Sequence, residues 1–132
     1  MLGELLGETT GKRTTRRMLS VDPPNVEVSF EESGKMLGVN ANGFGTYSSV
    51  VRNDGSLHGE GQGAIMTQDG DMISWKGSGV GKFKEKGALS YRGILYYRTT
   101  SQKLARLNNA AGVFEYEVDP EGKTQTKVWE WK

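Results

Sequence analysis

Apolar and polar side chains alternate along most of this chain, which is typical of strands with one buried and one exposed face. Turn-forming residues interrupt the alternation about every 10 to 15 positions. One stretch, 101–107, has the composition of a short helix that ends at Asn108-Asn109. The alternation predicts strands over nine ranges: 8–19, 25–32, 35–39, 42–53, 56–68, 71–84, 88–99, 111–119 and 123–131.

The predicted turns have a chemical basis. Pro23-Pro24 cannot join a central strand and ends the first one. Ser33-Gly34, Asp54-Gly55 and Asp69-Gly70 suit two-residue hairpin loops, because glycine adopts a positive φ at little cost. The segment 119–122 (Asp-Pro-Glu-Gly) suits a type I turn followed by a glycine bulge.

These elements predict an all-β fold. A chain of 132 residues buries about two-thirds of its surface on folding, which is enough for a core without disulfides. Successive hairpins with almost no helix indicate an antiparallel sandwich or barrel. We expect a closed up-and-down β-barrel of about eight strands, because closure removes exposed strand edges. We expect a single domain over residues 1–132.

The hairpin turns predict which side chains face the interior. With two-residue loops at Asp54-Gly55 and Asp69-Gly70, Tyr47 lies opposite Gln62 and Gln62 opposite Gly77. Lysines occupy the other face and are rarely buried, so this face is expected to be the inner one. A shift of one residue in either turn would invert the assignment. The register directs five candidate ligand-binding residues inward: Tyr47, His58, Glu60, Gln62 and Trp75.

A polar row inside an apolar barrel is typical of a small-molecule site, and the glycines opposite the row leave room for a ligand. His58 and Glu60 are the candidate catalytic residues, because they form the only acid–base pair that contains an imidazole. The same two side chains also fit a structural role in which each serves as the polar partner of the other. The orientation of Arg92, inward as a partner for Glu60 or outward, stays open.

Several chemistries are excluded or disfavoured. The chain has no cysteine, which excludes disulfides and thiol catalysis, and its single histidine lacks a third metal ligand. We therefore expect no metal and no cofactor. The glycines of 59–63 and 77–82 alternate within strands, so they form neither a dinucleotide fingerprint nor a phosphate loop. Ser78 faces away from His58 in the predicted register, which disfavours a serine hydrolase.

Charge and hydropathy limit the partners. The net charge is +1, so the four cations at Lys12, Arg13, Arg16 and Arg17 do not by themselves predict nucleic-acid binding. No apolar run approaches the length of a membrane helix, and residues 1–7 do not form a signal peptide. We expect a cytoplasmic protein that binds neither nucleic acid nor membrane. Trp129 and Trp131 share one face, in the core or at a contact between subunits, so a homo-oligomer stays open.

Several blocks of sequence carry a family resemblance. They are 57–63 (LHGEGQG), 79–83 (GVGKF), 104–108 (LARLN), 113–118 (VFEYEV) and 127–131 (KVWEW). These blocks resemble small uncharacterised prokaryotic proteins that are similar to the allene oxide cyclase-like barrels. That group implies an eight-stranded antiparallel barrel and includes trimeric plant enzymes that cyclise a fatty-acid epoxide inside the barrel. No catalytic motif of those enzymes matches this sequence, so the resemblance implies no catalytic residue here.

Three functional hypotheses follow. The first is a small-molecule-binding barrel with an apolar lumen and the polar row as its recognition element. The second is an isomerase or cyclase that acts on an apolar substrate in the lumen, with Glu60 as base or acid and His58 or Tyr47 as hydrogen-bond donor. The third is a structural or interaction protein whose barrel is filled by its own side chains.

Overall fold

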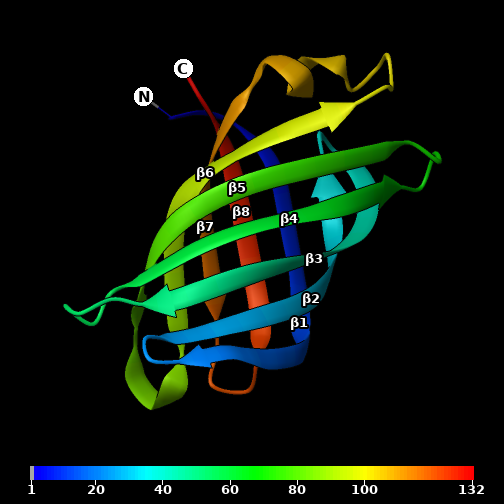
Figure 1. The fold of residues 1–132 in the computed structure, drawn as a ribbon. Helices are drawn as coiled ribbons and strands as arrows, with labels where there is room; N and C mark the ends of the chain where they lie inside the picture. Colours follow the sequence, from blue (N-terminus) through cyan, green and yellow to red (C-terminus); the bar gives the residue numbers. More distant parts are fainter. Residues whose placement is uncertain (1) are drawn as a thin grey trace.

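The computed structural model describes residues 2–132, which form a closed antiparallel barrel (Figure 1). Each strand pairs with its neighbours in the chain, and the last strand pairs with the first. This confirms the predicted fold class. The strands are β1 (Leu2–Val21), β2 (Pro24–Met36), β3 (Val39–Val51), β4 (Leu57–Thr67), β5 (Met72–Phe83), β6 (Leu89–Thr99), β7 (Ala111–Val118) and β8 (Lys123–Trp131).

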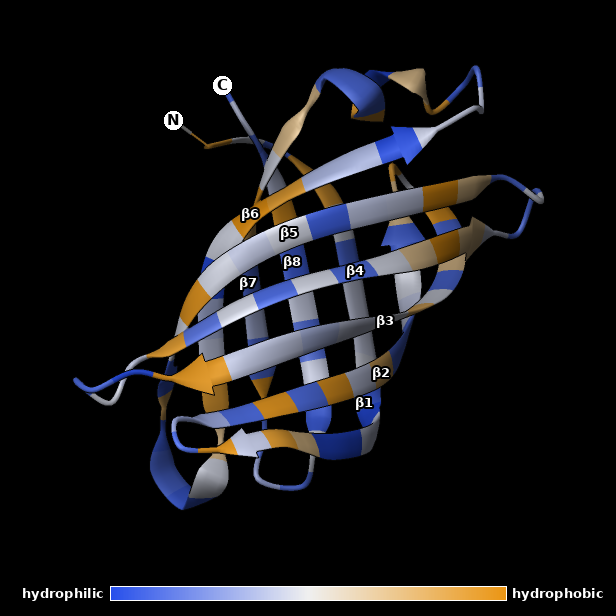
Figure 2. Cartoon of the chain, viewed as in Figure 1, coloured by the Kyte–Doolittle hydropathy of each residue, from blue (hydrophilic) through white to orange (hydrophobic). Residues whose placement is uncertain are grey.

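The alternation in the sequence becomes the inner and outer faces of the barrel wall. Figure 2 shows hydrophilic and hydrophobic residues alternating along β2. In that strand Val28, Phe30 and Met36 are buried in the interior, with exposed fractions of 5% or less. The turns after β1, β3, β5 and β7 lie at one end of the barrel, called here the turn end. The termini and the β6–β7 connection lie at the opposite end, the cap end (Figure 1).

One hairpin turn has the predicted form. The Gly122 amide donates to the Asp119 carbonyl at 3.0 Å, and the Asp119 amide donates to the Lys123 carbonyl at 2.9 Å. Gly122 has a φ of +89°, which glycine adopts without strain. This is the type I turn with a glycine bulge that the sequence predicts for 119–122.

The turns after β3 and β4 have this same form, so the predicted two-residue loops are wrong. The Gly55 amide donates to the Arg52 carbonyl at 2.9 Å, and the Gly70 amide donates to the Thr67 carbonyl at 3.0 Å. The extra bulge residue in each turn shifts the pairing by one position. His58 therefore lies opposite Val50 and Val80 rather than Val51 and Gly81.

The two shifts turn β4 over and leave its neighbours unchanged. Each shift inverts β4 relative to one flanking strand, so β3 and β5 keep the inner faces that the sequence predicts. Tyr47 and Trp75 line the interior as expected. His58, Glu60 and Gln62 point outward, and the glycines between them point inward.

The turn predicted at Ser33-Gly34 is also wrong. The range 35–39 is not a separate strand, because β2 runs to Met36 and the turn falls at Leu37-Gly38. Both turn residues have a positive φ, 49° and 80°, which is typical of a two-residue type I′ loop. A Cβ atom at Gly34 would lie 2.8 Å from the Thr9 Cα atom. Gly34 therefore marks a close approach of two strands.

The connection from β6 to β7, residues 100–110, forms a cap over one end of the barrel. It contains a short 3₁₀ helix, η2 (Ala105–Asn109), where the sequence predicts a helix over 101–107. Leu104 and Leu107 are 2% and 0% exposed and pack into the core cluster at this end. An unpredicted 3₁₀ turn, η1 (Glu85–Gly87), joins β5 to β6.

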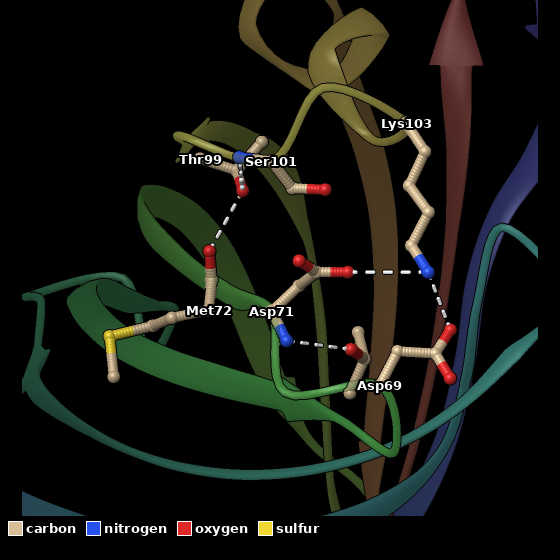
Figure 3. Close-up of polar contacts among 7 residues, drawn as sticks. Asp69, Asp71, Met72, Thr99, Ser101 and Lys103 are labelled. Carbon is tan, nitrogen blue, oxygen red and sulfur yellow. Dashed lines mark hydrogen bonds and ion pairs between the residues drawn. The ribbon is translucent and has the colours of Figure 1, made fainter.

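Polar contacts tie the cap to the β4–β5 turn (Figure 3). The Lys103 ammonium lies 2.6 Å from an Asp69 carboxylate oxygen and 3.6 Å from Asp71. Next to these ion pairs, at the adjoining ends of β6 and β5, the Thr99 hydroxyl donates to the Met72 carbonyl at 2.8 Å. The cap end is therefore closed by apolar side chains within and by ion pairs at the surface. No helix within residues 2–132 is long and apolar enough to cross a membrane.

Candidate functional site

The inward glycines of β4 and β5 make room for large side chains from neighbouring strands. A Cβ atom at Gly63 would lie 2.6 Å from two atoms of the Trp75 ring. A Cβ atom at Gly79 would lie 2.9 Å from the Phe114 ring. Both distances are too short for real contacts, so the glycines let the aromatic rings pack against the strand backbone.

Aromatic rings fill the middle and the turn end of the lumen. Phe30 packs against Tyr47, Trp75 and Tyr116 with ring centroids 5.6 to 6.3 Å apart. Tyr47 and Tyr116 meet edge to face at 5.7 Å, and Tyr91 packs on both. Such pairs contribute about 0.5–1.5 kcal/mol each beyond the area they bury.

The tyrosine hydroxyl groups form a short polar cluster within this apolar surrounding. The Tyr116 hydroxyl donates to the Tyr47 hydroxyl at 3.4 Å, and the Tyr91 and Ser49 hydroxyl groups lie 2.5 Å apart. Burial raises the pKa of Tyr47 to about 12 and also raises the pKa of Tyr91 and Tyr116. The three phenols are therefore neutral at physiological pH and can donate hydrogen bonds to a ligand.

Glu32 places a carboxyl group on the inner face of β2. Its exposed fraction is 9%, and its Oε1 atom accepts a hydrogen bond from the Thr9 hydroxyl at 2.5 Å. Burial raises the pKa of Glu32, and the Thr9 hydrogen bond offsets part of that effect. Among residues 2–132 no basic side chain forms an ion pair with Glu32. A carboxyl group buried without a cation is costly and often functional.

Sequence reasoning missed Glu32, although a signal was present. Val28, Phe30, Glu32 and Met36 alternate on one face of β2. The predicted turn at Ser33-Gly34 placed Glu32 at a strand end, where an exposed carboxylate is ordinary. Once β2 is continuous to Met36, the same alternation places Glu32 among buried apolar residues.

A cavity of about 80 Å³ lies between these groups. Thr9, Glu32, Tyr47, Trp75 and Tyr116 are among its lining residues. The volume exceeds the roughly 30 Å³ that one water occupies in the liquid, and an apolar cavity of about 150 Å³ binds benzene. The lumen as it stands therefore accepts a few heavy atoms, and binding of an aromatic ring requires an aromatic side chain to move aside.

The predicted polar row lies on the outer surface. The His58 Nε2 and Glu60 Oε1 atoms lie 3.7 Å apart, and the Glu60 side chain is 73% exposed. The two residues share one face, as predicted, but it is the outer one. Glu60 belongs to the strand that forms this part of the cavity wall, but its side chain points away from the cavity. Gln62 is exposed on the same outer face.

The orientation of Arg92, which the sequence leaves open, is also toward the outer surface. Arg92 points outward, 3.2 Å from a Glu117 carboxylate oxygen and 3.8 Å from Glu115.

Within residues 2–132 no three His, Asp or Glu side chains are arranged to hold a metal ion.

No family model matches the chain, and no curated protein matches it in sequence. Solved structures share its fold. A protein of unknown function from Clostridium acetobutylicum has a TM-score of 0.85 and 20% identity, covering 96% of each chain. A beta-barrel-like protein from Acinetobacter baumannii has a TM-score of 0.83 and 13% identity, covering 100% of this chain and 96% of that one. At these identities the similarity extends to the fold alone.

A fungal protein extends the comparison. An enzyme from Penicillium herquei matches with a TM-score of 0.68 and 15% identity, covering 96% of this chain and 92% of its own. The barrel architecture of this chain is therefore similar to that of two bacterial proteins, one of them of unknown function, and of a fungal enzyme.

Proposed function

We propose that the barrel binds a small, largely apolar molecule in its lumen and that Glu32 makes the polar contact to it. The supporting observation is a buried carboxyl group at the wall of a cavity surrounded by aromatic rings, with no paired cation among residues 2–132. Small-molecule sites have this composition, with apolar walls and a few placed polar groups. The resemblance to allene oxide cyclase-like barrels adds support, because enzymes of that group act inside the barrel.

The chemistry of Glu32 indicates which polar group the ligand carries. With its raised pKa, the carboxyl group is protonated over a wider pH range than an exposed one and can both donate and accept hydrogen bonds. A hydroxyl or carbonyl group of the ligand would form a hydrogen bond with the Glu32 carboxyl group. The rings of Tyr47 and Trp75 would pack against the apolar part of the ligand.

The test is ligand-observed NMR with phenol and toluene, which differ by the polar group and have similar shapes. We expect phenol to bind the wild type at least tenfold more tightly than toluene, and Glu32→Gln to weaken phenol binding about tenfold. Glu60→Gln is the matched control, because it makes the same change on the outer face of the wall. Equal weakening by both variants, or no binding of either probe, would contradict the proposal.

A second candidate function is isomerase or cyclase chemistry in the same lumen. Glu32 and the hydroxyl groups of Tyr47 and Tyr116 line one cavity, so a carboxylate base and neutral donors are available together. The Glu32 carboxylate would take a proton from a carbon next to a carbonyl group and return it elsewhere on the same molecule, while a tyrosine hydroxyl stabilises the enolate oxygen. The enzyme from Penicillium herquei is a precedent for catalysis in this architecture.

This second function is tested by hydrogen–deuterium exchange of acetone in D₂O, because acetone is small enough for the present cavity. Exchange faster with wild type than with Glu32→Gln, at equal acetone binding, is the expected result. Equal exchange rates would remove Glu32 from a catalytic role and leave binding as the function.

A further inference from the structure

The basic cluster near the end of β1 divides between the two faces of the barrel wall. Lys12 lies directly opposite Glu31 on the outer face, with their charged atoms 3.6 Å apart. Arg17 lies opposite Glu27 in the same way, at 3.4 Å. Each outward cation therefore has a cross-strand acidic partner.

Arg13 belongs to the inner face. It lies opposite the buried Phe30, in alternation with the buried Thr9 on the same strand. Its guanidinium packs on the β7–β8 turn, where the Nε atom lies 3.2 Å from the position of a Cβ at Gly122. The Arg13 amide also donates to the Gly122 carbonyl at 2.9 Å. These contacts hold the guanidinium against the β7–β8 turn, at the turn end of the barrel.

Arg13 and Arg16 interact electrostatically with the hydroxyl groups of the tyrosine cluster. Arg16 lies opposite the buried Val28, on the same side of the wall as Arg13. The positive charge of Arg13 lowers the pKa of Tyr47, Tyr91 and Tyr116 against the larger effect of burial, and Arg16 does so for Tyr47. Among the described residues neither arginine forms an ion pair, in contrast to Lys12 and Arg17.

We infer that the turn end of the barrel recognises an anion: Arg13 and Arg16 bind the carboxylate of a ligand whose apolar body enters the lumen. This inference rests on the lumen function proposed above and adds the ligand class, a small aromatic or aliphatic carboxylic acid. The guanidinium fork matches a carboxylate in a bidentate manner, and the neutral tyrosine hydroxyl groups supply further donors. Within residues 2–132 the two arginines have no anionic partner, and the carboxylate of the ligand supplies one.

The position of the arginines favours a small anion over a nucleic acid. The outward cations of the cluster are already matched by glutamates, and the net charge of the chain is +1. Affinity for nucleic acid requires several cations free to contact phosphates along one surface. Arg13 and Arg16, which form no ion pair within residues 2–132, lie instead at the inner-face positions of β1, opposite Phe30 and Val28.

The probes are benzoate and benzyl alcohol, which share the ring and differ in charge, and the readout is the dissociation constant by NMR titration. Arg13→Gln is expected to weaken benzoate binding at least tenfold and Arg16→Gln about threefold, without change for benzyl alcohol. Arg17→Gln is the matched control, because it removes the same charge from the outer face of the same strand. Arg13→Lys keeps the charge but loses the bidentate geometry, so we expect an intermediate loss.

The outcomes separate this inference from the lumen function. If benzyl alcohol binds in a Glu32-dependent way but benzoate binds no tighter, the anion site is wrong and the lumen function stands. If Arg17→Gln weakens benzoate as much as Arg13→Gln, the effect is one of net charge and the inference fails. If neither probe binds the wild type, both the lumen function and the anion site fail. If duplex DNA binds in an Arg13-dependent way and benzoate does not, a nucleic-acid surface replaces the proposal.

Discussion

At the scale of single residues, Glu32 is the described carboxyl group whose pKa burial raises. Its folded pKa is raised above its usual value of 4.5 by burial. The unfolded chain therefore releases this proton at lower pH than the folded chain does. The stability that the protonated group contributes is full below about pH 4.5 and is lost as the pH rises toward the folded pKa.

We expect the free energy of unfolding to depend on pH differently in the wild type and in Glu32→Gln. Between pH 4 and 8, the free energy of unfolding of the wild type falls relative to that of Glu32→Gln, which has no group to titrate. Urea denaturation across this range measures the difference, with Glu60→Gln as the control that makes the same substitution on the exposed outer face. Parallel curves for wild type and Glu32→Gln would mean that Glu32 is solvated.

The inward glycines make a second residue-scale prediction. Gly63→Ala places a Cβ 2.6 Å from the Trp75 ring and 2.7 Å from the Phe44 carbonyl oxygen, so it should cost about 1–3 kcal/mol of stability. Gly59→Ala is the matched control on the same face of β4, because its Cβ meets nothing closer than 3.3 Å. We expect that change to be below about 1 kcal/mol. Equal losses, measured by thermal unfolding, would contradict the packing of Trp75 against Gly63.

The candidate site was predictable only in part from its residues. The inward orientation of Tyr47 and Trp75 was predicted correctly, because β3 and β5 keep their faces when both turns shift together. His58, Glu60 and Gln62 were placed on the wrong face by the same shift. Glu32 was missed because a glycine that marks close strand packing resembles a glycine that makes a turn.

At the scale of elements, the face of β4 depends on turn geometry that the sequence does not fix. An Asp-Gly pair suits a two-residue loop and also a type I turn with a bulge. Proline at position 120 favours the type I turn in the last hairpin, so that turn was predicted correctly. Asp54-Gly55 and Asp69-Gly70 carry no such marker.

The orientation of β4 is testable by labelling, because the chain has no cysteine of its own. We expect Glu60→Cys to react with iodoacetamide in the native protein almost as fast as a free thiol. Ile65→Cys, on the inner face and at a position 5% exposed, should react at least 100-fold more slowly. The reverse order of rates would restore the register in which Glu60 faces the lumen.

The cap makes an element-scale prediction about what closes the barrel. Leu107 is 0% exposed in the cap-end core, so Leu107→Ala should cost about 2–5 kcal/mol. Lys103→Ala removes the exposed ion pairs with Asp69 and Asp71 and should leave global stability nearly unchanged. Urea denaturation compares the two. A larger loss from Lys103→Ala would mean that the ion pairs, rather than the leucines, hold the cap.

At the scale of the whole molecule, the barrel was predictable because it depends on alternation along the entire chain. An error of one residue in a turn inverts one strand without changing strand count, direction or closure. Which side chains fill the lumen depends instead on the register of single turns and on side-chain packing. Aromatic rings from neighbouring strands, rather than the predicted polar row, occupy the space beside the glycines.

The most direct test of the central claim is native mass spectrometry of the purified wild type, Glu32→Gln and Glu60→Gln, first in gentle buffer and then under collisional activation. A ligand held in the lumen by Glu32 predicts a defined extra mass per chain in wild type and Glu60→Gln, released on activation and reduced in Glu32→Gln. A carboxylic acid among the released species would support the anion site at Arg13, and the same spectra give the subunit count. A clean apo mass for the wild type, in gentle buffer and after incubation with phenol or benzoate, would contradict the account and favour a barrel filled by its own side chains.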